Sequence, residues 1–151
     1  MAGWVRFRIK GQAGDSIRLR FAESLQDNGE LYTRNFRDAR STDVYVANGR
    51  ETKDATWAPR FIYHGFRYVE VSGYPDAKAE DFVAEVVEDE MEHTGTFNCS
   101  DETLNKIVRN AFWGIRSNYK GMPVDCPQRN ERQPWLGDRT TVSYTHLRAH
   151  E

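Results

Sequence analysis

Hydrophobic and polar positions follow two different periods along the chain, and the period changes near residue 100. In the first part, apolar side chains alternate with arginine and lysine at residues 5–9 and again at residues 17–21. Such alternation places one row of side chains in a core and the other in water, as in a half-buried β-strand. Glycine and aspartate at residues 11–15 favour a turn, so the pattern predicts that the two strands form a hairpin.

Shorter apolar runs continue this β pattern. They predict strands at residues 43–46, 55–57, 66–72 and 82–87. Between them lie the turn sequences Asn28-Gly29, Asn48-Gly49 and Gly73-Tyr74-Pro75. Short strands at this spacing are typical of an antiparallel β-sandwich.

The second part of the chain has helical periodicity. Ser100 is a suitable N-cap, and an apolar stripe at a spacing of three and four predicts one amphipathic helix over residues 101–120. Gly121 and Pro123 end it. A single helix cannot bury its stripe alone, so it needs partners. The stripe is Leu104, Ile107, Val108, Ala111, Phe112 and Ile115.

Composition and charge narrow the classes of function. A net charge of −2 lacks the basic surplus of a nucleic-acid binder, and no polybasic patch or long apolar run indicates a membrane partner. Cys99 and Cys126 have no cysteine or histidine at metal-ligand spacing, so we expect two free, half-buried thiols, with no metal and no cofactor. His64 is expected to be a packing residue.

The segment 125–138 concentrates the chemistry, with three prolines between Pro123 and Pro134 and no sustained period. Carboxylates accept hydrogen bonds from sugar hydroxyls, arginine donates them, and tryptophan offers a flat apolar face. Crowded carboxylates can also keep one of them protonated, as a general acid requires. The alternative is a solvated loop with a few ion pairs. The segment holds three carboxylates (Asp125, Glu131 and Asp138), two arginines (Arg129 and Arg132) and one tryptophan, Trp135.

The string DCPQRNERQPWLGD resembles the catalytic signature of bacterial α-L-rhamnosidases, family 78 of the glycoside hydrolases. Upstream, GWVRFRIKGQAGDSIRLRFAESL and YHGFRYVEVSGYP resemble the β-sandwich of that family, and TGTFNCSDETLNKIVRNAFWGIRSN resembles its first catalytic helix. The resemblance covers about residues 1–139 in the family's order. It implies a concanavalin-like antiparallel β-sandwich followed by the first helix and active-site loop of an (α/α) six-hairpin toroid.

Residue by residue, the resemblance implies that Glu131 is the general acid. Asp125 and Arg129 would bind rhamnose, Trp135 would pack beside the sugar ring, and Asp138 would assist the acid. The family's usual aspartate before the catalytic glutamate is Asn130 here, and its common Leu-Gly before the tryptophan is Gln133-Pro134. These departures leave the linkage open.

The resemblance also implies an inverting mechanism on terminal α-L-rhamnosyl residues of glycans or glycosides. Inversion needs a second carboxyl about 6.5–9.5 Å from the acid, to activate water. In the family this base is a glutamate far downstream. Asp125 and Asp138 are candidates for it only if the resemblance misleads.

We therefore expect a truncated piece that is inactive alone. Its parts would be an N-terminally truncated sandwich (residues 1–90), the start of the catalytic domain (91–139) and a tail (140–151) that resembles a translated sequencing adapter from a metagenomic fragment. A bacterial periplasmic or extracellular location is compatible with a signal peptide lost by truncation.

Two other classes remain open: a non-catalytic carbohydrate-binding sandwich, which would present exposed aromatics on its β half, and a structural interaction domain.

Overall fold

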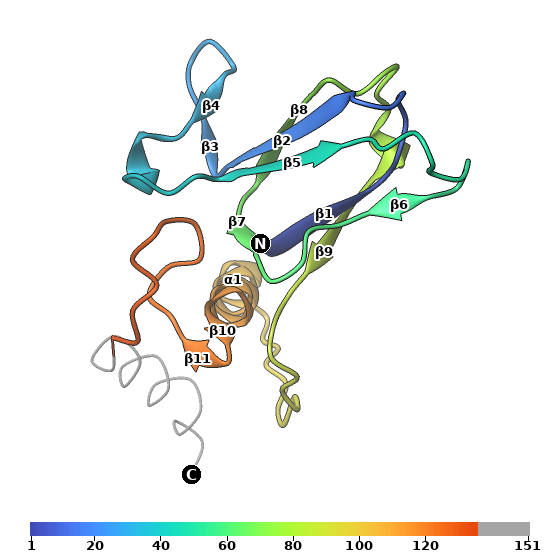
Figure 1. Ribbon diagram of the computed structural model, residues 1–151. Helices are drawn as coiled ribbons and strands as arrows, with labels where there is room; N and C mark the ends of the chain where they lie inside the picture. Colours follow the sequence, from blue (N-terminus) through green and yellow to red (C-terminus); the bar gives the residue numbers. More distant parts are fainter. Residues whose placement is uncertain (136–151) are drawn as a thin grey trace.

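Two main antiparallel sheets, two short hairpins and one α-helix are the chief elements of the described part of the protein, residues 1–135 of a computed structural model (Figure 1). In the first sheet, β1(Ala2–Arg8) pairs along one edge with β9(Phe82–Val86) and along the other with β6(Thr56–Trp57) and β7(His64–Gly65). The second sheet has the order β5(Thr42–Val46), β2(Ser16–Ala22), β8(Tyr68–Ser72). A separate hairpin joins β3(Ser24–Leu25) to β4(Leu31–Tyr32).

The predicted hairpin between the first two strands is wrong. β1 and β2 lie in different sheets and do not pair with each other. Their apolar rows face one another across the core instead, so that Val5 and Phe7 of β1 share one buried cluster with Ile17, Leu19 and Phe21 of β2. Alternation identifies which side of a strand is buried. It does not distinguish two strands that pair within one sheet from two strands that pack face to face in different sheets.

The other strand predictions are confirmed, since β5, β6, β8 and β9 occupy the predicted segments. So is the fold class: an antiparallel sandwich precedes a helical segment. His64 is a packing residue, as expected. Its ring stacks on Phe21 with centroids 4.2 Å apart, and its Nε2 lies 2.8 Å from the buried Oδ1 of Asp43.

The turn after β4 carries the 3₁₀ helix η1(Arg34–Phe36), which belongs to a second apolar cluster. Phe36 is buried there against Ala22 and Leu31. The burial fixes the position of the turn that follows, residues 37–39.

The predicted helix is confirmed as α1(Glu102–Asn118), but its N-cap is Asp101 and not Ser100. The Asp101 carboxylate accepts hydrogen bonds from the backbone N–H groups of Thr103 and Leu104, as a capping side chain does. The predicted stripe is only partly covered, because Leu104, Ile107 and Phe112 remain 40–56% exposed.

The connection between sandwich and helix is tied by polar contacts. Arg116 of α1 donates from Nη2 to Glu88 Oε1 at 2.8 Å, and the Asp89 carboxylate accepts from the Gly121 amide at 2.8 Å. Both contacts fasten the C-terminal end of the helix and the turn that follows it to the segment directly after β9(Phe82–Val86). Over residues 1–135, no helix has the length and hydropathy that a membrane crossing requires.

Candidate functional site

The candidate site loop, residues 124–135, begins directly after a tight hairpin that follows the helix. The hairpin consists of β10(Tyr119–Lys120) and β11(Met122–Pro123), with Gly121 between them at φ +69°. Val124 and Cys126 are then both buried, at 4% and 6% exposure. Because alternate residues of an extended segment point to opposite sides, these two anchors turn Asp125 away from the core.

The loop docks on the sandwich at Gly65 of β7. A Cβ atom there would lie 2.8 Å from the backbone nitrogen of Gln128 and 2.9 Å from Pro127 Cγ, so only glycine allows this approach. Arg132 reinforces the contact, since its Nη2 donates to the backbone oxygens of Tyr63 (2.9 Å) and Pro127 (3.0 Å).

The ring of Tyr63 receives two cations. The Arg132 guanidinium lies 4.2 Å from the ring centroid and Lys120 Nζ lies 4.6 Å from it. Burial, together with the neighbouring charge of Arg132, lowers the pKa of Lys120 to about 8. This interface therefore joins the sandwich to the base of the site loop.

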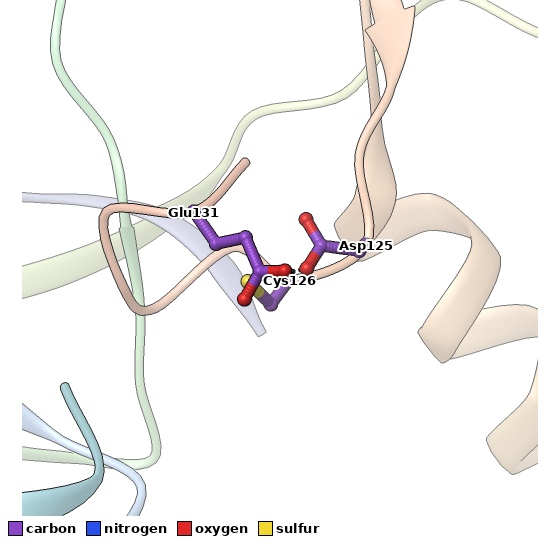
Figure 2. A group of neighbouring side chains, drawn as sticks. All are labelled: Asp125, Cys126 and Glu131. Atoms are coloured by element: carbon purple, nitrogen blue, oxygen red, sulfur yellow. Dashed lines mark hydrogen bonds between the residues drawn. The ribbon is translucent and has the colours of Figure 1, made fainter. Parts of the chain in front are cut away.

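Three side chains of the loop converge on one point: Asp125, Cys126 and Glu131 (Figure 2). One oxygen or sulfur atom from each lies within 4.8 Å of the other two. Arg129 contacts all three groups, at 3.7 Å from Asp125 Oδ2, 3.2 Å from the Cys126 sulfur and 2.7 Å from Glu131 Oε2. The loop is therefore closed around one guanidinium group.

These three groups are the described residues whose types and spacing could hold a metal ion. Arg129 pairs with both carboxylates and Arg37 pairs with Glu131, so two guanidinium groups balance the charge of the two carboxylates without a metal. The hydrogen bond to the Cys126 sulfur, together with the charges of Glu131 and Asp125, raises the pKa of Arg129 further. We therefore interpret the cluster as an organised ion-pair site.

The Glu131 carboxyl has different neighbours at its two oxygens. Oε1 accepts a hydrogen bond from Trp135 Nε1 at 3.2 Å. Oε2 lies 2.7 Å from Arg129 and 2.9 Å from Arg37 of the sandwich, yet neither N–H is aligned well enough for a hydrogen bond. Only 17% of the side chain is exposed. A largely buried carboxyl is thus held by two cations and one indole.

Asp125 is held as a carboxylate. Partial burial alone would raise its pKa, but this effect is outweighed by hydrogen bonds from the Cys126 thiol and the Gln133 amide and by the charge of Arg129, so the pKa lies below its usual value. Oδ1 accepts from the Gln133 amide at 2.9 Å and Oδ2 from the thiol at 3.3 Å. A carboxylate in this state accepts hydrogen bonds and does not donate a proton.

Four of the five sequence-predicted site residues are thus brought together: Asp125, Arg129, Glu131 and Trp135. Asp138 lies outside the described residues, as does the tail over residues 140–151 that resembles a translated sequencing adapter.

Sequence reasoning missed Arg37 and assigned no specific role to Arg132. Arg132 stood within the recognised string without a distinguishing feature. Arg37 lies in a polar turn far away in the sequence, and no local pattern links it to Glu131.

The carboxylates, arginines and tryptophan of the loop are side chains suited to a carbohydrate-active protein. Family comparison makes this specific. Residues 1–88 match the bacterial α-L-rhamnosidase concanavalin-like domain, and residues 92–150 match the bacterial α-L-rhamnosidase six-hairpin glycosidase domain. The chain belongs to the bacterial α-L-rhamnosidase family.

Relatives agree in sequence and in structure. The chain is 42% identical over 150 residues to an α-L-rhamnosidase of Formosa agariphila, covering 97% of this chain and 16% of that protein. The Streptomyces avermitilis α-L-rhamnosidase, solved in complex with L-rhamnose, superposes with a TM-score of 0.89 at 40% identity, over 96% of this chain and 14% of the other.

The native α-L-rhamnosidase of Aspergillus terreus superposes with a TM-score of 0.84 at 41% identity, over 91% and 16% of the two chains. The chain thus spans 14% to 16% of the length of these three relatives.

Proposed function

We propose that this chain supplies the acid half of an inverting α-L-rhamnosidase site, with Glu131 as the general acid. The observation that carries the proposal is the environment of Glu131: a carboxyl that is 17% exposed, fixed at one oxygen by Trp135 and at the other by two guanidinium groups. A proton donor must be held at one orientation to the glycosidic oxygen, and these contacts supply that restraint.

The neighbouring groups suit rhamnose binding. Asp125, kept as a carboxylate, would accept hydrogen bonds from sugar hydroxyls, and Arg129 would donate to them. Trp135 is 53% exposed and would offer its ring face to the sugar. Asp138 would assist the acid. Support for the sugar itself comes from the L-rhamnose complex of the Streptomyces avermitilis relative.

The general base would come from outside the described residues. Asp125 has an oxygen within 4.8 Å of one oxygen of Glu131, whereas inverting pairs stand about 6.5–9.5 Å apart to admit a water molecule. Asp125 is therefore too close to serve as that base. The proposed division remains a sandwich over residues 1–90 and the start of the catalytic domain over residues 91–139.

The test is a chimera in which this chain replaces the matching segment of the Streptomyces avermitilis relative. In that enzyme, Glu131→Gln should lower the turnover of a rhamnoside with a poor leaving group about 10²- to 10⁴-fold, because the amide keeps the shape but has no acidic proton. The turnover of an activated aryl rhamnoside should fall much less, since its leaving group needs little protonation.

Glu92→Gln, a change at an exposed glutamate outside the loop, is the matched control and should leave both substrates unchanged. An equal, small loss on both substrates in Glu131→Gln would remove Glu131 from the role of acid. A chimera that binds rhamnose but hydrolyses neither substrate would favour the binding-module alternative.

A further inference from the structure

The turn of the sandwich that reaches the site loop has an unusual backbone. Arg37 follows η1 with φ 60° and ψ −121°, a conformation that non-glycine residues rarely adopt. Such a conformation is strained and persists only where surrounding contacts hold it. Here the preceding residue, Phe36, is 1% exposed in the second apolar cluster, so the turn starts from a fixed point.

Two consecutive residues of this turn contact two consecutive residues of the site loop. Arg37 Nη2 lies 2.9 Å from Glu131 Oε2, and the Asp38 carboxylate accepts a hydrogen bond from the Asn130 side-chain amide, 92 positions away. In Figure 1 the loop after β11 lies beside the segment that follows β4. The strained turn is therefore in direct contact with the site loop.

Arg37 differs from the other two neighbours of Glu131 in where it comes from. Arg129 and Trp135 belong to the same loop as Glu131, so they move with it. Arg37 is anchored in the sandwich, through the buried Phe36. Of the contacts that the described residues make with the Glu131 carboxyl, it alone joins the carboxyl to a separate packed body.

We propose that Arg37 is a positioning residue for Glu131, contributed to the site by the β-sandwich; this rests on the proposed role of Glu131 as the acid. Arg37 forms an ion pair with Oε2 at 2.9 Å, which restrains the position of the carboxyl relative to the sandwich. When Glu131 gives its proton to the oxygen of the leaving alcohol, the C–O bond to rhamnose breaks while a water molecule bonds to the anomeric carbon from the opposite face and gives its proton to the general base. A negative charge then remains on the Glu131 carboxyl. Arg37 then stabilises that charge, together with Arg129.

The role predicts a dependence on the leaving group. In the chimera described above, Arg37→Ala should lower kcat for the poor leaving group about 100-fold, the cost of a misplaced catalytic group, with little change in KM. For an activated aryl rhamnoside, the fall in kcat should be about tenfold smaller, because its leaving group needs less protonation. Arg37→Lys should recover part of kcat, since it keeps the charge but not the planar fork.

Arg34→Ala is the matched control, because Arg34 is exposed in the same turn and makes no ion pair with any residue in the described range. It should behave as the unmodified chimera. Equal losses on both substrates in Arg37→Ala, a change in KM alone, or no difference from Arg34→Ala would overturn the proposal.

A second measurement uses the chain itself. The folding equilibrium constant is measured by urea unfolding for Arg37→Ala, Glu131→Gln and the double variant. If Arg37 contacts Glu131, the folding equilibrium constant of the double variant falls by a smaller factor than the product of the factors for the two single variants. If the factor for the double variant equals that product, the two residues do not interact, and the proposed contact is overturned whatever the chimera shows. An inactive chimera with coupled losses would keep the contact and reject the proposed function.

Discussion

At the scale of single residues, the hydrogen bond between Tyr45 and Glu51 makes the stability of the sandwich depend on pH. The Tyr45 hydroxyl donates to Glu51 Oε1 at 2.6 Å, and the Asn48 amide donates to the same oxygen at 2.7 Å. The bond from Tyr45, followed by the backbone amides, lowers the pKa of Glu51 from 4.5 to about 2. The same bond raises the pKa of Tyr45 from 10 to about 12.

The signs of these shifts define the expected behaviour of Tyr45→Phe. The lowered pKa of Glu51 stabilises the fold fully above pH 4.5 and is lost as the pH falls towards 2. The raised pKa of Tyr45 stabilises the fold below pH 10 and is lost as the pH rises towards 12. Urea unfolding should therefore find Tyr45→Phe less stable than the wild type by a constant amount from about pH 5 to 9, with the gap closing on both sides.

Ring packing is preserved in this variant, because phenylalanine keeps the contacts of Tyr45 with Phe7 and Trp57. Tyr32→Phe is the control, since the Tyr32 hydroxyl makes no hydrogen bond among the described residues and should show no gap. A gap for Tyr45→Phe that stays constant down to pH 2 would contradict the assigned bond.

At the scale of elements, β7 and the site loop meet where Gly65 leaves room for a backbone. Gly65→Ala would press its new methyl group on Gln128 N and Pro127 Cγ, at 2.8 and 2.9 Å, and a backbone neighbour cannot turn away as a side chain can. We expect this variant to lose about 1–3 kcal/mol in urea unfolding, the usual cost of overpacking.

Gly114→Ala makes the same chemical change in α1, where nothing lies within 4 Å of the new methyl group. It should stabilise the chain by up to about 1 kcal/mol, because alanine favours a helix over glycine. Two losses of equal size would show that the close approach at β7 has no special cost.

The elements also show what periodicity can and cannot predict. The helix and most strands followed from their periods because each period reports one buried face. The pairing of β1 did not follow, since its true partners β6, β7 and β9 lie far along the chain. The predicted site residues that share one string, from Asp125 to Trp135, do lie together in the structure. Arg37 could not be predicted, because its contact with Glu131 depends on how sandwich and loop are folded together.

At the scale of the whole molecule, the proposed function gives the described residues only one half of a catalytic pair. Glu131 has its restraints, but inversion also needs a carboxyl on the opposite face of the sugar to deprotonate water, and Asp125 lies too close to Glu131 to be that group. The apolar stripe of α1 is likewise only half covered, with Ile107 56% exposed. The exposed stripe of α1 and the lack of a second carboxyl at the required distance among the described residues both indicate that this segment packs against more of the family's helical domain.

The chain by itself should therefore not hydrolyse an aryl α-L-rhamnoside above the rate of buffer, and it should bind L-rhamnose only weakly. Proximity contributes to catalysis only when both reacting groups are held in place, and here one is lacking among the described residues. The measurement is release of the aryl alcohol at high protein concentration, with titration calorimetry for L-rhamnose. Glu131→Gln of the same chain is the control for contaminating enzyme. Turnover that Glu131→Gln abolishes would mean that a base lies within the 151 residues after all, and Asp138 would be the first carboxylate to replace.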